Sequence, residues 1–512
     1  MRVSLCQVDP ILGDLIYNKN LILRNYNEAI KKGADIVVFP ELVVTGYPPM
    51  DLLNSEQFII DNLSVVDDIA SSSSIPIIFG FIRIDKNRKY NSAAICGNKK
   101  MLYTYDKILL PNYDVFDEKR YFYPGQTPGV FTLKIKNKNT KIGVQICEDL
   151  WGDDQTKDIT KAQKDLGAEC IINISASPFT HSKIEKRYKT VVSKVLENKI
   201  PFHYCNLVGS QDELIFDGTS FSISKEGNLI NQLSSFKEHN KTLGISNKLN
   251  IKFKISSIEE NTFKALCLGI KGYFYKTGFE KALIGLSGGI DSALVATISA
   301  LALGSENISG VALPSKYSSK HSVIDAKVLS ENLNINFEVI SIEDTIEQFD
   351  TLFHEKFKNT QKNIAEENLQ ARTRGNILMT LANKFNYLLL TTGNKTELAL
   401  GYCTLYGDMS GSLSIISDLN KVEVYNLSKW INKKFGNLIP ENSILKDPSA
   451  ELSENQVDPF DYDIIAPLVD DIISQDFTFK ELVKKGYEES EVAKIYNIIK
   501  NNEYKRKQAT LG

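Results

Sequence analysis

Short apolar runs alternate with amphipathic stretches along the first half of the chain. Residues 2–8 and 35–40 are apolar runs of strand length, and residues 19–32 between them have the apolar spacing of a helix that Gly33 can end. Five further apolar runs follow before residue 210, together with two helix-like stretches. This alternation predicts a layered α/β domain with well-buried strands.

The pattern loosens at residues 225–260, which are polar, rich in Asn, Lys and Ser, and without a sustained period. A loss of pattern of this kind is typical of a domain junction. We therefore predict an N-terminal domain over residues 1–245, a linker over 246–260 and a C-terminal domain over 261–512.

The α/β alternation returns in the second half of the chain. A helix at about 259–277 precedes an apolar strand at 281–286, a Ser-Gly-Gly turn and a helix at 291–303. A strand, a glycine-rich turn and a helix in this order are typical of a sheet that binds a nucleotide. The sequence thus predicts an α/β protein whose second domain is a parallel-sheet nucleotide-binding domain.

Composition excludes several other classes of protein. The 512 residues include 60 Lys and Arg against 63 Asp and Glu, and the net charge of −3 argues against a strongly basic nucleic-acid-binding protein. The apolar runs are far shorter than the ~20 residues of a membrane span, and the first residues lack the pattern of a secretory signal. The seven cysteines are scattered and include no CxxC pair, so neither a disulfide framework nor a zinc site is indicated. We expect a cytoplasmic protein that binds neither nucleic acid nor a membrane.

Three chemically capable side chains follow strand-like runs in the first domain. Glu41, Lys107 and Cys147 each stand where an apolar run ends. A thiol needs a base to become a nucleophile, and a nearby cation favours the thiolate and stabilises an oxyanion, so the three together are sufficient for attack on an amide. Each also has a simpler explanation. A lone cysteine is more often a small core residue, Glu41 could cap a helix, and Lys107 could be a solvated loop charge.

The segments around these residues resemble the signature segments of the nitrilase, or carbon–nitrogen hydrolase, superfamily. FPELVVTGYP, YDKILLPNYDVFDE and GVQICEDLW occur in the order found in that family. The resemblance covers about residues 1–245 and implies a four-layer αββα sandwich with a Glu41–Lys107–Cys147 catalytic triad. Glu118 matches a second acidic residue of the family, which orients the lysine.

Further matches resemble the glutamine-hydrolysing members of that superfamily. The stretches NYDVFDEKRYF and SASPFTHSK carry this resemblance. It implies that glutamine is held by Tyr113, Glu148, Ser177 and Lys183. For Ser177 a plain turn before Pro178 is the alternative.

The segment LIGLSGGIDS, residues 283–292, is the second candidate site. Its glycines permit a tight turn before a helix, and the backbone N–H groups of such a turn form a nest for a phosphate group. No GxxxxGK[ST] motif occurs, and the segment resembles the ATP pyrophosphatase loop, in which Asp291 is a magnesium ligand. The predicted ATP-binding residues are Gly285, Leu286, Ser287, Gly288, Gly289, Ile290, Asp291, Ser292 and Thr392. A strand–turn–helix without a ligand is the structural alternative.

Later segments resemble the NAD synthetase family. ENLQARTRGNILMTLANK places Asn368 and Arg372 on one helix face, and LLLTTGNKTELALGYCTLYGD adds Thr392, Glu397 and Asp408. The resemblance covers about residues 260–512 and implies that Asn368, Glu397 and Lys505 bind deamido-NAD. It also implies that Asp291 and Glu397 bind magnesium, so the expected cofactors are ATP and Mg²⁺.

The two resemblances together predict an ATP-dependent ligase that takes its nitrogen from glutamine and amidates deamido-NAD. Members of this family are homo-oligomers, so we expect one here. One alternative is amidation of a different nucleotide or carboxylic acid on the same scaffold. Another is a non-catalytic sensor, which would have no need of Glu41, Lys107 and Cys147 together.

Overall fold

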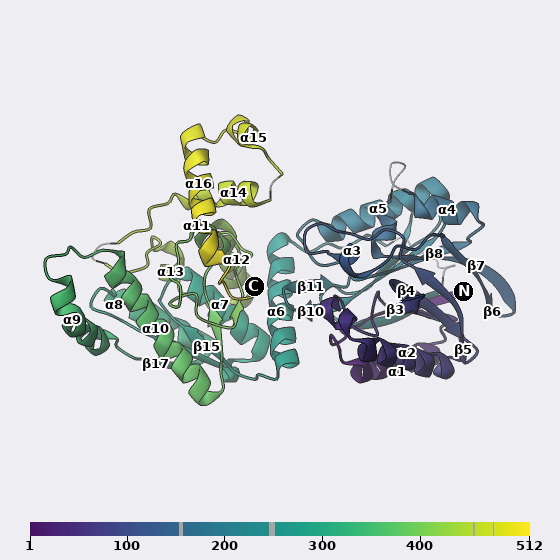
Figure 1. Ribbon diagram of the computed structural model, residues 1–512, viewed down its shortest axis with the longest axis horizontal. Helices are drawn as coiled ribbons and strands as arrows, with labels where there is room; N and C mark the ends of the chain where they lie inside the picture. Colours follow the sequence, from purple (N-terminus) through teal and green to yellow (C-terminus); the bar gives the residue numbers. More distant parts are fainter. Residues whose placement is uncertain (153–156, 245–250, 454–455, 475) are drawn as a thin grey trace. The chain divides into compact units, whose positions relative to one another are not determined.

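The computed structural model describes residues 1–152, 157–244, 251–453, 456–474 and 476–512. The chain divides into two compact units, Met1–Ser257 and Ile258–Gly512, which we describe separately (Figure 1). Residues 245–250, which include the start of the predicted linker, lie outside the described residues.

Two six-stranded sheets form the N-terminal unit. The first has the order β14-β1-β2-β3-β4-β5 and the second the order β13-β12-β9-β8-β7-β6. The first comprises β1 (Arg2–Gln7), β2 (Ile36–Val38), β3 (Ile77–Asp85), β4 (Arg88–Gly97), β5 (Lys100–Asp106) and β14 (His239–Gly244). The second comprises β6 (Gly129–Ile135), β7 (Lys138–Ile146), β8 (Cys170–Ser175), β9 (Phe202–Asn206), β12 (Phe221–Ile223) and β13 (Leu229–Gln232).

The sheets pack face to face through an apolar layer that includes Leu5 and Val38 from the first and Ile146 and Ile172 from the second. Helices α1 (Leu15–Lys31) and α2 (Glu56–Ser72) cover the outer face of the first sheet. Helices α4 (Ile159–Asp165) and α5 (Lys183–Asn198) cover that of the second (Figure 1). The predicted four-layer αββα sandwich is confirmed.

Strand β14 is a part of this unit that the sequence pattern did not indicate. It lies within residues 225–260, where the apolar pattern loosens, yet it pairs antiparallel with β1, with Lys241 opposite Leu5. Because β14 is an edge strand of its sheet, main-chain hydrogen bonds rather than a run of apolar side chains hold it in place.

The C-terminal unit is built on one parallel sheet of five strands, in the order β17-β16-β15-β18-β19. The strands are β15 (Ala282–Gly285), β16 (Ile308–Ala312), β17 (Asn336–Val339), β18 (Leu388–Thr391) and β19 (Leu413–Ser414). The predicted parallel sheet is therefore confirmed. Because β16 and β18 flank β15 on opposite sides, the strand order reverses at β15, and a ligand crevice is expected at the carboxyl ends of these parallel strands.

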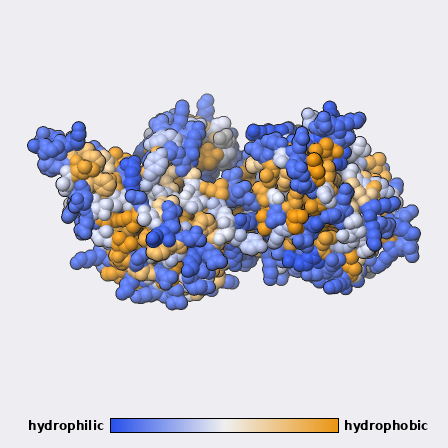
Figure 2. Space-filling view, turned by 60° about the horizontal axis from the view of Figure 1, so that its bottom comes forward, coloured by the Kyte–Doolittle hydropathy of each residue, from blue (hydrophilic) through white to orange (hydrophobic). Residues whose placement is uncertain are grey.

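Helices surround this sheet and bury its apolar side chains. They are α6 (Ile258–Thr277), α7 (Ile290–Leu303), α8 (Lys320–Leu333), α9 (Glu343–Phe357), α10 (Ile364–Phe385), α11 (Lys395–Leu400), α12 (Lys421–Phe435) and α13 (Glu441–Leu445). Further along the chain, α14 (Tyr462–Ile473), α15 (Phe479–Lys484) and α16 (Glu489–Asn501) form a small apolar cluster with α11 (Figure 1). Hydrophilic side chains cover much of the face seen in Figure 2, with hydrophobic patches between them. In the described part of the chain, no helix is long and apolar enough to cross a membrane.

Candidate active sites

Glu41 and Lys107 meet in the interior of the N-terminal unit. Glu41 follows β2 and Lys107 follows β5, and the fold brings Lys107 Nζ to 2.7 Å from Glu41 Oε1. Lys107 is 1% exposed and Glu41 is fully buried. Since an ion pair in such a place is hardly screened by water, each charge depends on the other.

Lys107 is held by a second carboxylate, that of Glu118. Its ammonium also donates to Glu118 Oε1 at 2.8 Å, and the same oxygen accepts from the Tyr47 hydroxyl at 2.9 Å. Burial raises the pKa of Glu118 to about 7. Lys107 opposes this rise, and the negative charge of Glu41 adds to it. Burial by itself would lower the pKa of Lys107, but Glu118 and Glu41 outweigh it and raise that pKa. The ammonium therefore stays charged, while Glu118 can carry a proton near neutral pH.

Cys147 is the first residue after β7 and opens a short 3₁₀ turn over Cys147–Leu150. Its backbone has a φ of 41°, in the left-handed region, and the residue is 5% exposed. Burial raises the pKa of its thiol well above the ordinary value, Glu41 adds to the rise, and Lys107 opposes it. The expected lowering by Lys107 is thus present but outweighed. The thiol is neutral in this arrangement, and it needs a base when it attacks.

Asp149 ties the turn of Cys147 to the segment of Lys107. Its carboxylate accepts from the backbone N–H of Ile146 on one side and from those of Ile108 and Leu109 on the other, at 2.9–3.1 Å. The Tyr105 hydroxyl donates a fourth hydrogen bond at 2.8 Å. Burial raises the pKa of Asp149 to about 6. These bonds fix the backbone on both sides of the group formed by Glu41, Lys107 and Cys147.

Asn91 is a contact of this group that the sequence pattern did not single out. It lies on β4, and its Nδ2 donates to Glu41 Oε1 at 2.7 Å. Its backbone carbonyl accepts from the N–H of Lys107 at 2.9 Å. No local pattern indicates this role, because in NSAAIC an asparagine next to a strand is most simply a residue of its exposed end.

Two of the predicted glutamine-binding residues, Tyr113 and Glu148, line an open cleft of about 700 Å³ together with Trp151. The Tyr113 hydroxyl donates to Glu148, 3.0 Å from Oε2 and 3.2 Å from Oε1. Lys183 begins α5 and places its Nζ 5.0 Å from the centre of the Trp151 ring. Burial lowers the pKa of Lys183. Three of the four predicted residues therefore belong to one region of the surface.

Ser177 lies deeper than the other three. It is 2% exposed, and its N–H donates to Asn206 Oδ1 at 2.9 Å. The preceding residue, Ala176, donates its N–H to Glu41 Oε2 at 2.8 Å. Ser177 is thus one residue away from a direct contact with Glu41, and the segment that holds it is tied to the same buried group.

The turn after β15 has the backbone that the second motif predicts. Gly288 has a φ of +78°, and a Cβ there would lie 2.3 Å from the carbonyl oxygen of Ser322, so only glycine fits. The Ser287 hydroxyl accepts from the N–H of Gly289 at 3.2 Å. Helix α7 begins directly after this turn, so its positive N-terminal end faces the crevice.

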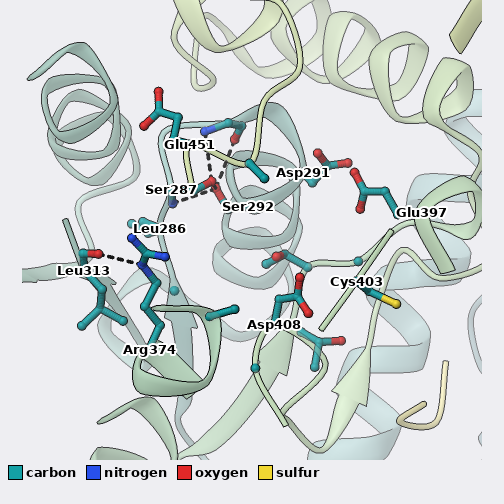
Figure 3. A pocket seen from close by; sticks show the side chains of 18 of the residues that line it. Leu286, Ser287, Asp291, Ser292, Leu313, Arg374, Glu397, Cys403, Asp408 and Glu451 are labelled. Carbon is teal, nitrogen blue, oxygen red and sulfur yellow. Dashed lines mark hydrogen bonds between the residues drawn. The ribbon is translucent and has the colours of Figure 1, made fainter. Parts of the chain in front are cut away.

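This turn opens on a pocket of about 320 Å³ in the C-terminal unit (Figure 3). The predicted ATP-binding residues that line it are Gly285, Leu286, Ser287, Gly289, Ile290, Asp291, Ser292 and Thr392. Glu397 and Asp408 line it as well. Gly288 is not among the described residues that line the pocket. Its positive φ shapes the turn instead.

The carboxylates of Asp291 and Glu397 lie next to each other in this pocket (Figure 3). Both contact one ammonium, that of Lys421, with 2.6 Å from Nζ to Asp291 Oδ2 and 3.1 Å to Glu397 Oε1. Burial raises the pKa of Glu397 to about 7, with Lys421 opposing the rise and Asp291 adding to it. Burial would lower the pKa of Lys421, but the two carboxylates raise it overall. Lys421 is therefore a fixed cation in the pocket.

Three basic residues that line this pocket, Arg374, Lys421 and Lys446, were not predicted, and the first two are the most deeply buried. Lys421 begins α12 behind an N-cap asparagine, a position where a lysine is usually solvated. Arg374 donates from Nε to the carbonyl oxygen of Leu313 at 2.9 Å, and burial lowers its pKa to about 10 (Figure 3). Only the tertiary fold shows that both side chains turn inward.

Asn368 and Lys505 lie beside the pocket, outside its described lining residues. Asn368 Oδ1 accepts from the Thr404 hydroxyl at 2.9 Å, and Arg372 Nε donates to the carbonyl oxygen of Leu405 at 3.2 Å. The two side chains therefore share a face of α10, as their spacing predicts. Lys505 donates to the carbonyl oxygens of Gly401 and Cys403 at 2.7 Å each. All three contact the segment 401–405.

Both units match known protein families. The carbon–nitrogen hydrolase family matches residues 2–245, and the NAD synthase family matches residues 262–509. Together with the two sites, these matches define a class of ligase that carries its own hydrolase domain.

Relatives match the whole chain. A glutamine-dependent NAD⁺ synthetase of Thermotoga maritima is 38% identical and one of Acinetobacter baylyi is 37% identical, and each match covers all of this chain and 95% of the relative. The solved structure of the glutamine-dependent NAD⁺ synthetase of Acinetobacter baumannii in complex with ADP is 34% identical, with a TM-score of 0.83 over all of this chain and 95% of that one. The chain belongs to the glutamine-dependent NAD⁺ synthetase family.

Proposed function

We propose that this protein makes NAD⁺ from deamido-NAD, with ATP as the activating substrate and glutamine as the source of nitrogen. The observation that carries the proposal is that one chain holds a buried Cys–Lys–Glu group and a phosphate-binding turn beside two paired carboxylates. The first suits amide hydrolysis and the second suits adenylation, and the relatives named above perform glutamine-dependent NAD⁺ synthesis.

In the proposed hydrolysis, Cys147 Sγ attacks the side-chain amide carbon of glutamine while its proton passes to Glu41. The C–N bond then breaks, the proton goes to the leaving nitrogen as ammonia forms, and a thioester remains. Water hydrolyses the thioester to glutamate. Two electrostatic observations support this step. The thiol has a raised pKa and therefore needs a base, and the buried Lys107 ammonium can stabilise the oxyanion.

The cleft lined by Tyr113 and Glu148 is the proposed route for glutamine. The Glu148 carboxylate can accept hydrogen bonds from the α-ammonium of an amino acid. The Tyr113 phenol can donate a hydrogen bond to its α-carboxylate. Lys183 offers a cation at the same cleft, next to Trp151, and Ser177 lies on the segment that also contacts Glu41. We therefore keep Tyr113, Glu148, Ser177 and Lys183 as the proposed glutamine-binding set.

In the proposed ligation, a carboxylate oxygen of deamido-NAD attacks the α-phosphorus of ATP and pyrophosphate leaves. Ammonia then attacks the activated carbonyl carbon and AMP leaves. The glycine turn at Gly288 and Gly289 and the N-terminus of α7 behind it suit the phosphates. Thr392 lines the same pocket.

Mg²⁺ is the proposed metal, and the donor set fits it. Asp291 and Glu397 supply carboxylate oxygens, which Mg²⁺ prefers, and both reach one common cation, the Lys421 ammonium. When bound, the ion neutralises phosphate charge and stabilises the pyrophosphate leaving group.

Asn368, Glu397 and Lys505 are the proposed contacts of deamido-NAD. Asn368 and Lys505 gather at the segment 401–405, directly beside the pocket that Glu397 lines. We also keep as proposals the domain boundaries at residues 245 and 261, a homo-oligomer and a cytoplasmic location.

One assay tests the proposed function. ATP, glutamine and deamido-NAD are supplied together and with each one omitted, and pyrophosphate, glutamate and NAD⁺ are measured. We expect NAD⁺ and AMP only from the complete mixture. Pyrophosphate release that depends on a different nucleotide or carboxylic acid, and not on deamido-NAD, would overturn the proposed substrate.

A further inference from the structure

All four carboxylate oxygens of the proposed magnesium ligands already accept a hydrogen bond. Lys421 Nζ donates to Asp291 Oδ2 and to Glu397 Oε1. Asn394 supplies the other two donors, with its Nδ2 2.8 Å from Asp291 Oδ1 and its N–H 3.3 Å from Glu397 Oε2. No oxygen of this pair is therefore without a donor.

Several contacts hold Lys421 in this position. Its side chain is 3% exposed, and its backbone N–H donates to the Thr396 hydroxyl at 3.1 Å. The ring of Tyr462 lies against the ammonium, 5.3 Å from Nζ to the ring centre. Because this buried side chain is held at both its backbone N–H and its ammonium, keeping it in one conformation costs little additional conformational entropy.

We propose that Lys421 is an internal substitute for the divalent cation and bars it from Asp291 and Glu397 until a nucleotide binds. Mg²⁺ requires its oxygen ligands at ~2.1 Å, so it cannot share these oxygens with an ammonium already in contact with them, and the two positive charges repel. The phosphates of a nucleotide give the ammonium an alternative anionic partner. The carboxylates then become free for the metal that accompanies the phosphates.

This inference rests on the proposed role of Asp291 and Glu397 as metal ligands, and it has its own consequence. Without nucleotide, the protein should bind a divalent cation poorly despite two buried carboxylates that lie next to each other. Removing the ammonium should create an open site. Metal therefore enters the pocket with ATP, and free Mg²⁺ does not occupy it beforehand.

The test measures Mn²⁺ binding to the full-length protein without nucleotide, by electron paramagnetic resonance of free Mn²⁺ and by calorimetry. Lys421→Met replaces the ammonium with an apolar group of similar length. Lys395→Met is the matched control, because Lys395 pairs with Asp470 instead and does not contact Asp291 or Glu397. We expect Lys421→Met to bind Mn²⁺ at least ten times more tightly than wild type, and Lys395→Met to equal wild type. Adding Asp291→Asn to Lys421→Met should abolish the gain.

Two results would overturn the inference. The first is that wild-type protein binds one Mn²⁺ without nucleotide as tightly as Lys421→Met does. The other is a gain in Lys421→Met that survives Asp291→Asn, which places the metal elsewhere. If Lys421→Met is unstable without metal, its unfolding temperature should rise with Mn²⁺ by more than that of wild type, and equal rises would count against the inference. Wild-type NAD⁺ formation in the complete assay mixture would leave the proposed function standing in each case.

Discussion

Lys107 Nζ lies 2.7 Å from Glu41 Oε1, in a place where neither side chain reaches water. The same ammonium contacts Glu118, so one buried cation serves two buried carboxylates. An arrangement with this many buried charges is weak evidence for stability as such, because desolvation offsets the attraction. It is better explained by chemistry at Cys147, which needs both a base and a cation.

Lys107→Met should abolish most glutamine hydrolysis and also destabilise the N-terminal unit. Loss of the oxyanion-stabilising cation should lower kcat at least ~100-fold, and the two carboxylates left without a partner should cost about 3–5 kcal/mol. Glutamate release and urea unfolding measure the two effects. Lys138→Met, which removes an exposed ion pair with Glu169, is the control and should change neither. Hydrolysis by Lys107→Met within twofold of wild type would remove Lys107 from the reaction.

Asn91→Ala should lower kcat for glutamine hydrolysis about 10- to 100-fold with little change in KM. A hydrogen bond to a charged group contributes about 1.5–3 kcal/mol, and here it orients the proposed base rather than the substrate. Asn62→Ala is a matched control: Asn62 is also buried, but its Nδ2 donates to the backbone of Ile82 at 2.7 Å, away from Glu41. If both variants lose stability and kcat to the same extent, Asn91 is only structural.

Glu118→Gln should flatten the pH dependence of stability in the acid range. Because burial raises the pKa of Glu118 from 4.5 to about 7, the folded state binds its proton more tightly than the unfolded state does. The resulting stabilisation is complete below pH 4.5 and is lost as the pH rises to about 7. Urea midpoints between pH 4.5 and 7.5 should therefore fall less steeply in the variant than in wild type. Parallel curves would contradict the raised pKa.

Asp291→Asn should stop NAD⁺ formation from either glutamine or ammonium and leave glutamine hydrolysis possible. The change keeps the size of the side chain but removes the charge that a divalent cation needs beside the pyrophosphate. Pyrophosphate and glutamate release are measured in parallel on the same preparation. Unchanged ATP consumption would remove Asp291 from the site.

Much of the fold and the order of the site residues could be predicted from the sequence. The runs that end near Glu41 and Cys147 are strongly apolar because they become the buried strand β2 and the buried end of β7, and the Ser-Gly-Gly turn is marked by a position where only glycine fits. The family resemblances then predicted the reactions in which these residues take part.

The rest depends on tertiary contacts that leave no local pattern. Strand β14 is polar because it is an edge strand, so its pairing with β1 cannot be predicted from periodicity. Asn91 and Lys421 belong to a strand and a helix start like many others, and only the fold turns them onto buried carboxylates. The spacing of charged residues along the chain also gave no sign that the thiol of Cys147 would have a raised pKa.

The most direct test of a glutamine-hydrolysing site that feeds a separate ligation site is Cys147→Ala, assayed with ATP and deamido-NAD and with either glutamine or a high concentration of ammonium chloride. The variant lacks the nucleophile but keeps every residue of the pocket in the C-terminal unit. We predict that it forms no NAD⁺ from glutamine and forms NAD⁺ from ammonium at a rate close to that of wild type. NAD⁺ formation from glutamine by Cys147→Ala at the wild-type rate would contradict the proposed function, because the nitrogen would then be released elsewhere.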